Sequence, residues 1–279
     1  MDETDLQLDD GHSLHVYDTG AGPSLTVFWH HGTPNIGAPP APLLAASERL
    51  GIRWLSYDRP GYGGSSPRPG RDLASAATYV TGVADAYGVD RFAVMGHSGG
   101  APHALACAAL LPERVTGVVS IASLAPFDAE GLDWFAGMAD SGVASLRAAS
   151  AGREAKERHE AEHGDDYDPE FIPADMTALS GSWAWVLDVV RPAAAQGPAP
   201  AIDDDLAYVS EWGFDTSQVH APALFLHGGL DRVVPASHSQ WLAHRCPTAE
   251  HRLFPDDGHI SILTQADDAL EWLAENASG

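Results

Sequence analysis

Short apolar runs rich in β-branched and aromatic residues alternate along this chain with longer stretches rich in alanine and leucine. The apolar runs are Leu6–Leu8, Leu14–Tyr17, Leu25–His30, Ile52–Tyr57, Phe92–Met95, Val115–Ala122, Ala223–Leu226 and His251–Phe254. The helix-like stretches between them include Leu73–Tyr87, Ala101–Leu111 and Ser237–Arg245. Strands that alternate with helices in this way predict an α/β fold, with a mostly parallel sheet flanked by helices on both faces.

The alternation is interrupted between Pro126 and Phe214. This stretch contains helical patterns, prolines and loops but no clear strand, and the strand–helix order then resumes. An insertion in an α/β core is the simplest explanation. We therefore expect a core made of residues 1–125 and 215–279 and a helical cap, or lid, made of residues 126–214.

The net charge of the chain limits the kinds of molecule that it can bind. The 279 residues include 39 acidic and 15 basic side chains, a formal net charge of −24. Such a surface repels phosphate backbones and anionic membranes, so we expect no nucleic-acid or membrane partner. No window approaches the roughly 18 uncharged apolar residues of a membrane helix, and the N-terminus is acidic where a secretory signal is basic and then apolar. We expect a cytoplasmic monomer or homodimer that acts on a small molecule.

A glycine-rich turn carries the main chemical signal. The sequence Gly96-His-Ser-Gly-Gly100 directly follows a predicted strand and precedes a predicted helix. A serine becomes a useful nucleophile when a sharp strand-to-helix turn holds its hydroxyl out beside a base. That turn crowds the backbone two positions before and two positions after the serine, where this chain has glycine. The pattern makes Ser98 the candidate nucleophile.

A serine nucleophile needs a base and a carboxylate that orients the base. His259 lies in a loop after the last predicted strand, and Asp231 directly follows the strand Ala223–Leu226. The order serine, aspartate, histidine is the one found in hydrolases with this type of turn. Asp256 and Asp257 are rival carboxylates, but they stand close to the histidine in sequence, in a segment that we expect to be exposed.

An oxyanion hole would complete the site. The sequence His31-Gly-Thr-Pro34 follows the strand Leu25–His30, where the loop that supplies one of its amides is expected. The backbone N–H groups of Thr33 and Gly99 are the candidate donors to a carbonyl oxygen that becomes negative. An ordinary Gly-Pro turn is the alternative interpretation of this loop.

These motifs together resemble the α/β-hydrolase superfamily over nearly the whole chain. The matching segments are His31–Pro34, Asp58–Ser65, Gly96–Gly100, Gly228–Pro235 and Asp257–His259. The resemblance implies a hydrolase with a Ser-His-Asp triad and no cofactor, a structural loop at Asp58–Ser65, and a cap over the break in the alternation. It does not name a substrate.

Comparison with subfamilies limits the activity. Epoxide hydrolases and haloalkane dehalogenases of this fold use an aspartate nucleophile, which Ser98 argues against. Proline iminopeptidases carry His-Gly-Gly-Pro-Gly where this chain has His31-Gly-Thr-Pro-Asn35, so aminopeptidase activity is less favoured. The ending Asp-Arg-Val-Val-Pro235 resembles carboxylesterases, lactonases and C–C bond hydrolases of ring-cleavage pathways alike. We expect cleavage of an ester or related acyl bond in a small apolar substrate. The alternatives are a C–C hydrolase, a proline iminopeptidase-like aminopeptidase and a ligand receptor on the same fold.

Two further groups of residues contain possible metal ligands. The sequence His159-Glu-Ala-Glu-His163 matches a zinc-binding pattern, but its neighbours are nearly all charged, so we expect a solvated helix and no metal. The two cysteines, Cys107 and Cys246, lack metal-ligand spacing. The candidates for substrate contacts are His97, Trp134 and Trp183.

Overall fold

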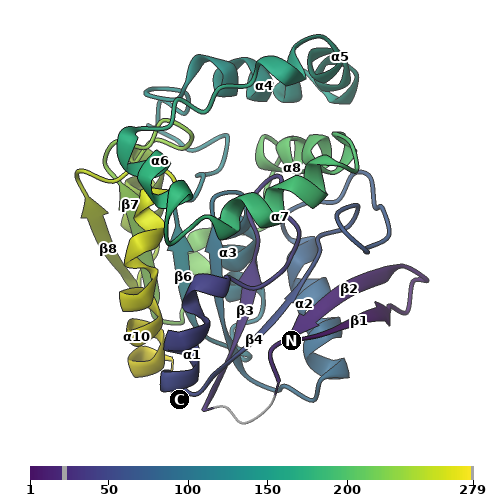
Figure 1. The fold of residues 1–279 in the computed structure, drawn as a ribbon, viewed down its shortest axis with the longest axis vertical. Helices are drawn as coiled ribbons and strands as arrows, with labels where there is room; N and C mark the ends of the chain where they lie inside the picture. Colours follow the sequence, from purple (N-terminus) through teal and green to yellow (C-terminus); the bar gives the residue numbers. More distant parts are fainter. Residues whose placement is uncertain (21–23, 278–279) are drawn as a thin grey trace.

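The computed structural model describes residues 1–20 and 24–277, and its centre is an eight-stranded sheet with strand order β1-β2-β4-β3-β5-β6-β7-β8 (Figure 1). The strands are β1 (Asp2–Gln7), β2 (Ser13–Asp18), β3 (Leu25–His30), β4 (Ile52–Tyr57), β5 (Phe92–His97), β6 (Val115–Ile121), β7 (Ala223–Gly228) and β8 (Ala249–Phe254). From β4 to β8 every neighbouring pair is parallel, whereas β1 and β2 form an antiparallel hairpin that pairs with β4. The predicted α/β fold is confirmed.

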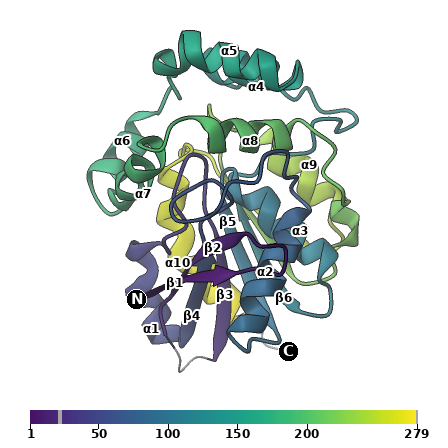
Figure 2. The same cartoon turned by 90° about the vertical axis from the view of Figure 1, so that its right-hand side faces the viewer.

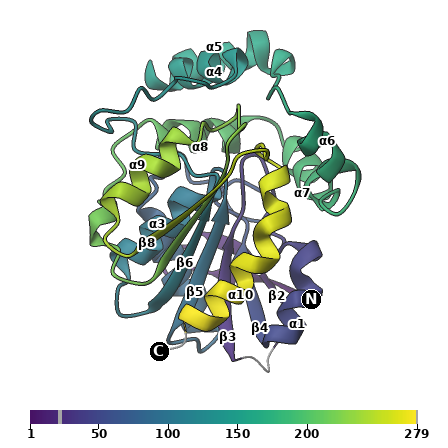
Figure 3. The same cartoon turned by 90° about the vertical axis from the view of Figure 1, so that its left-hand side faces the viewer.

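Helices cover both faces of the sheet (Figures 2 and 3). One face packs against α2 (Ser75–Ala86), α3 (Gly100–Leu110) and α9 (Ser237–Arg245), and the other packs against α1 (Leu44–Leu50) and α10 (Ala266–Asn276). The central strand β5 is buried along its whole length. Continuous burial explains why its sequence is an unbroken apolar run rather than an alternating one.

The first strand begins before the predicted run Leu6–Leu8 and overlaps it only at Leu6 and Gln7. β1 occupies Asp2–Gln7 and is exposed along most of its length. Its position is set by pairing with β2, from Asp2 opposite Asp18 to Gln7 opposite Ser13. Acidic side chains on an edge strand oppose pairing with a second chain, and they also remove the apolar pattern by which a strand is recognised.

The break in the alternation is helical in the structure. Between β6 and β7 lie α4 (Asp140–Ser150), α5 (Arg153–His163), α6 (Pro173–Ser180), α7 (Trp185–Ala194) and α8 (Ala199–Tyr208). Residues 126–214, all of which the structure describes, contain no strand, and we refer to them as the helical segment. The helical segment lies over the carboxyl ends of the parallel strands, with α4 and α5 farthest from the sheet (Figure 1). In the part of the chain that the structure describes, no helix has the length and apolarity to cross a membrane.

Three consecutive aspartates on α8 connect the layers of the helical segment. Asp203 pairs with Arg153 of α5, and Asp205 Oδ2 lies 2.7 Å from Lys156 Nζ, also on α5. Asp204, between them, pairs with arginines of the core. Successive helical positions project in different directions, so one short acidic run can hold α5 on one side and the core on another.

The helix α5 differs from the solvated helix that its sequence suggests. Lys156, the only lysine of the chain, is 1% exposed, and its ammonium group also lies 2.5 Å from Glu160 Oε1. The remainder of the helix is mostly exposed. The expectation was wrong for one face of α5, because a charged residue can be buried when partners on a distant helix compensate it.

Replacing Lys156 by alanine should leave Asp205 and Glu160 without their shared cation. We predict a loss of about 3 kcal/mol in the free energy of unfolding, at the low end of the range for broken buried ion pairs, because both carboxylates keep partial exposure. Chemical denaturation measures this loss. Arg158→Ala, which breaks an exposed pair with Glu154 on the same helix, is the matched control and should cost at most about 0.5 kcal/mol. Equal effects of the two variants would contradict the prediction.

Candidate active site

Ser98 lies in the turn between β5 and α3. Its φ of 54° places it in the left-handed region, which residues with a side chain rarely adopt. A Cβ at Gly96 would lie 2.5 Å from the carbonyl oxygen of Gly100, and a Cβ at Gly100 would overlap the backbone of His30. Both positions therefore require glycine for the turn to form, as the sequence pattern indicates.

The side chains of Ser98, His259 and Asp231 form one hydrogen-bonded chain. Ser98 Oγ lies 2.9 Å from His259 Nε2, and His259 Nδ1 lies 2.8 Å from Asp231 Oδ2. Since a carboxylate only accepts, His259 carries its proton on Nδ1 and presents the lone pair of Nε2 to the serine hydroxyl. The structure thus brings together the three residues that the sequence singles out, although they are up to 161 positions apart.

Asp231 is held by its own loop and by a second histidine. Its Oδ1 accepts hydrogen bonds from the amides of Val233 at 2.8 Å and Val234 at 2.9 Å. His227 Nε2 lies 3.3 Å from Asp231 Oδ2. Burial by itself raises the pKa of the Asp231 carboxyl, but the rings of His259 and His227 outweigh it and hold that pKa well below its ordinary value. The carboxylate is therefore charged whenever it orients His259.

The loop that carries His259 is fastened to the helical segment. Asp175 of α6 is buried, and its Oδ1 accepts from the amides of Ile260 at 2.9 Å and Ser261 at 2.7 Å and from the Ser261 hydroxyl at 2.9 Å. A Cβ at Gly258 would overlap the same carboxylate. The position of the histidine therefore depends on a side chain from outside the core.

His97 lies beside this chain of side chains and not in the cavity. Its Nε2–H donates to the carbonyl oxygen of His259 at 2.9 Å, and the two rings are 5.0 Å apart. Burial lowers the pKa of His97 to about 3, so the ring is neutral at ordinary pH. The arrangement suits a support for the His259 loop better than the substrate contact expected from the sequence.

The loop with Thr33 lies against the serine turn. A Cβ at Gly32 would lie 3.6 Å from Ser98 Cβ, so the two segments are in direct contact. Among the described residues, none accepts a hydrogen bond from the backbone N–H of Thr33 or Gly99. Both amides are therefore available to an anionic oxygen near Ser98.

A cavity of about 770 Å³ opens over Ser98. Its walls come from the core at Thr33, Pro34, Ser98, Gly99, Leu124, Val233 and Val234, and from the helical segment at residues of α4, α5 and α8. Trp134 and Trp183, predicted as substrate contacts, are buried elsewhere and are absent from these walls. Trp134 packs against His238 and donates to the Ala125 carbonyl, and Trp183 packs in the core near α6.

The far wall of the cavity is strongly charged. It contains Asp140, Glu160, Asp166, Asp205, Lys156, His159 and His163. The two histidines of the zinc-like pattern thus lie at the cavity, with ring centroids 5.5 Å apart. Within the described residues no cluster of three or more His, Cys, Asp or Glu side chains is arranged to hold a metal ion.

Comparison with known proteins assigns the family. Residues 26–266 match the family model described as alpha/beta hydrolase fold. The chain belongs to the α/β-hydrolase family. Its solved structural relatives include the enol-lactonase from Burkholderia xenovorans, with a TM-score of 0.73 and 20% identity, covering 99% of this chain and 100% of that one. This likeness shows the shared fold, and the family predicted from the motifs is confirmed.

Curated relatives of this α/β hydrolase include enzymes of two activities. The pimeloyl-(acyl-carrier protein) methyl ester esterase of Nitrosomonas europaea is 30% identical over 260 residues, which cover 90% of this chain and 94% of the relative. The 2-hydroxymuconate semialdehyde hydrolase of Pseudomonas putida is 29% identical over 275 residues, 92% of this chain and 88% of the relative. The chain is thus related over most of its length to an esterase and to a C–C hydrolase.

Sequence reasoning missed the residues that support this site from outside the core. Asp175 of α6, together with Asp204 and Tyr208 of α8, contacts the loops of His259, Thr33 and Gly99. Asp204 stands in the run Asp203–Asp205, whose acidity is typical of a solvated surface, and Asp175 stands in a short helix with no other acidic residue. Pro173 two residues before Asp175 marks a helix start, but nothing local indicates which loop the aspartate reaches.

Buried neutral histidines should make folding sensitive to mild acid. Burial lowers the pKa values of His30, His97 and His238 to about 3, about 3 and about 4. In the unfolded chain a histidine titrates near pH 6.5. Below about pH 6.5 the unfolded state therefore binds more protons than the folded state, and the free energy of unfolding decreases as the pH is lowered. Each of the three histidines should lower the free energy of unfolding by about 1.4 kcal/mol for each pH unit of acidification between roughly pH 6 and 4.5.

Urea denaturation at pH 7, 6 and 5 tests this dependence. His238→Asn should have a smaller pH slope of the unfolding free energy than the wild type, by about 1.4 kcal/mol per pH unit. An unfolding free energy that stays constant from pH 7 to pH 5 would show that these histidines are protonated in the folded state.

Proposed function

We propose that the protein is a serine hydrolase that cleaves a carboxylic ester, or a related acyl bond, of a small substrate through an acyl-enzyme on Ser98. The observation that carries the proposal is the chain from Ser98 Oγ to His259 and Asp231, with separations of 2.9 Å and 2.8 Å, beside a cavity whose wall includes Ser98. Hydrolase relatives over most of the chain support it.

Acylation follows from the direction of the hydrogen bonds. His259 Nε2 accepts the hydroxyl proton while Ser98 Oγ bonds to the carbonyl carbon, and the carbonyl electron pair moves onto its oxygen. The amides of Thr33 and Gly99 then donate to this oxyanion, and Asp231 stabilises the imidazolium. When the tetrahedral intermediate collapses, the bond to the leaving oxygen breaks and His259 returns its proton to the departing alcohol.

Deacylation repeats these roles with water. His259 accepts a proton from a water molecule that attacks the acyl carbon, and the same two amides hold the second oxyanion. Collapse breaks the bond to Ser98 Oγ, which takes the proton back and leaves a carboxylic acid. None of these steps requires a cofactor.

The charge of the cavity supports an acyl group without a carboxylate. Four carboxylate side chains and one ammonium group line the far wall, and Lys156 is already paired with Asp205 and Glu160. A relative whose name specifies a muconate substrate must accommodate an anion, for which this wall is repulsive. The C–C hydrolase alternative is therefore less favoured than an esterase acting on neutral or cationic substrates.

Ser98→Ala should lower kcat for p-nitrophenyl butyrate by at least about 10⁴-fold, because the nucleophile is lost while the cavity stays intact. Asp231→Asn should have a similar effect by stabilising the wrong tautomer of His259. Steady-state kinetics and stoichiometric labelling by a fluorophosphonate measure both. Ser141→Ala, which removes another serine of the cavity, is the matched control and should leave kcat nearly unchanged.

Unchanged turnover in Ser98→Ala would refute the proposal. Stoichiometric labelling of the wild type without turnover of any ester, lactone, amide or ring-fission product would instead support the receptor alternative. The panel includes a proline p-nitroanilide, so that aminopeptidase activity is tested in the same experiment.

The charged wall should discriminate between substrates of equal size. We predict that kcat/KM for p-nitrophenyl butyrate exceeds that for mono-p-nitrophenyl succinate by about tenfold, since one carboxylate of the substrate would face carboxylates of the wall at an effective dielectric constant near 20. The ratio should shrink at high salt. A preference for the succinate ester would favour an anionic substrate of the ring-cleavage type.

A further inference from the structure

A buried charge cluster lies between α8 and the core, directly behind the loop that carries Thr33. The Asp204 side chain is fully buried, and its two oxygens lie 2.6 Å from Arg59 Nη2 and 2.6 Å from Arg71 Nη1. The Tyr62 hydroxyl donates to Asp204 Oδ2 at 2.9 Å. Burial opposes ionisation of Asp204, but the two guanidinium groups hold its pKa well below the ordinary value. Asp204 is therefore a permanent carboxylate.

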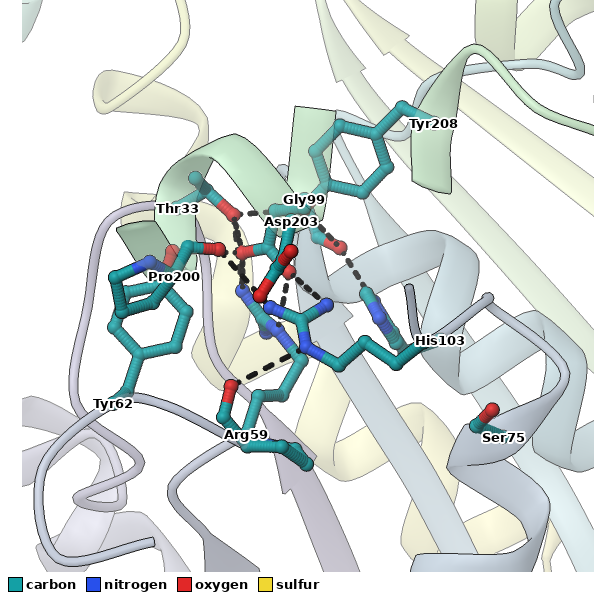
Figure 4. A network of polar contacts seen from close by, with 12 residues as sticks. Thr33, Arg59, Tyr62, Ser75, Gly99, His103, Pro200, Asp203 and Tyr208 are labelled. Carbon is teal, nitrogen blue, oxygen red and sulfur yellow. Dashed lines mark hydrogen bonds and ion pairs between the residues drawn. The ribbon is translucent and has the colours of Figure 1, made fainter. Parts of the chain in front are cut away.

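The cluster fixes the Thr33 loop by several hydrogen bonds at once (Figure 4). The Thr33 hydroxyl donates to Asp204 Oδ2 at 2.5 Å. Arg59 Nη2 donates to Thr33 Oγ1 at 2.9 Å and to the Gly32 carbonyl at 3.0 Å, and Arg59 Nη1 donates to the His31 carbonyl. An arginine presents its donors in a rigid planar fork, so the orientation of three consecutive residues is tied to one side chain.

Tyr208, four residues after Asp204 on α8, connects the same loop to the residue that follows Ser98. Its hydroxyl lies 2.7 Å from Thr33 Oγ1 and 3.2 Å from the Gly99 carbonyl. Because the Thr33 proton is given to Asp204, the single hydroxyl proton of Tyr208 is shared between Thr33 Oγ1 and the Gly99 carbonyl oxygen in a three-centre hydrogen bond. A Cβ at Gly99 would overlap the tyrosine hydroxyl and lie 2.7 Å from Thr33 Oγ1. The close approach of α8 and the Thr33 loop therefore leaves no room for a side chain at Gly99.

From this geometry we propose that Asp204 and Tyr208 are positioning residues that set the direction and spacing of the Thr33 and Gly99 amides. The inference rests on the proposed function, in which these amides hold the oxyanion. Two donors on separate segments stabilise a developing charge only when both point at it before the reaction. The helix α8 supplies this alignment, so the helical segment is part of the reacting apparatus as well as a wall of the cavity.

The test compares Asp204→Asn and Tyr208→Phe with the wild type on p-nitrophenyl butyrate. We expect kcat to fall by about 10- to 100-fold through misaligned amides, while KM changes less than threefold. A trifluoromethyl ketone, which forms a tetrahedral oxyanion on serine, should lose affinity by the same factor. The corresponding alcohol, which forms no adduct, should bind as it does to the wild type.

Asp203→Asn is the matched control. Asp203 neighbours Asp204 on α8, but its carboxylate pairs with Arg153 of α5 instead of with Arg59 or Arg71. Its loss should leave kcat and the affinity for the ketone within twofold of the wild type. Hydrogen exchange of the backbone amides in residues 31–36 gives a readout that does not depend on activity: it should accelerate in Asp204→Asn and Tyr208→Phe but not in Asp203→Asn.

Several outcomes would overturn the inference. Folded Asp204→Asn and Tyr208→Phe proteins with unchanged kcat would do so, as would a rise in KM at constant kcat, or equal losses for ketone and alcohol. If Asp204→Asn does not fold, Tyr208→Phe alone decides, since it removes a single hydroxyl. A wild type without turnover would refute the proposed function, whereas unchanged exchange in residues 31–36 would refute the role of α8.

Discussion

The ion pairs of Asp204 with Arg59 and Arg71 are the interaction on which the arrangement of the site depends. Three charges are buried together there, and each is compensated only while the others remain in place. Such a cluster is weak evidence for net stability, because removing charges from water costs about as much as their attraction returns. Its effect is geometric, because the two ion pairs tie α8 to the core at Arg59 and Arg71.

A second buried carboxylate acts in parallel. Asp175 holds the loop of His259 as Asp204 holds the loop of Thr33, and both come from the helical segment. The core supplies Ser98 and Asp231 on turns that directly follow strands, where the sheet itself fixes the backbone. The longer loops of Thr33 and His259 lack that support and receive it from outside. The site is therefore assembled by two parts of the chain, each of which is incomplete without the other.

The fold and the turn that carries Ser98 were predictable because their signals are local. A buried strand is an apolar run wherever it occurs, and the turn at Ser98 needs glycine at Gly96 and Gly100 for steric reasons within a few residues. The supporting groups were not predictable because their signals are long-range. Lys156 and Asp204 stand in charged surroundings typical of a solvated surface, and only the packing of α5 on α8 and of α8 on the core buries them. The tryptophans at positions 134 and 183 were predicted to contact substrate, but they are buried away from the cavity. Large apolar side chains pack in cores more often than they contact ligands.

These contacts also limit how a substrate can reach Ser98. Lifting the whole helical segment would separate Asp175 and Asp204 from the loops that they hold, and would strand buried charges. Separating α5 from α8 would leave those two contacts in place, but it would break the pair of Asp203 with Arg153 and the buried pair of Asp205 with Lys156. Most charged groups of the far wall of the cavity lie on α4, on α5 or in the turn that follows α5, whereas Asp205 lies on α8. The charge that faces the cavity therefore comes mainly from the layer outside α8, while the contacts of Asp204 and Tyr208 with the Thr33 loop lie between α8 and the core.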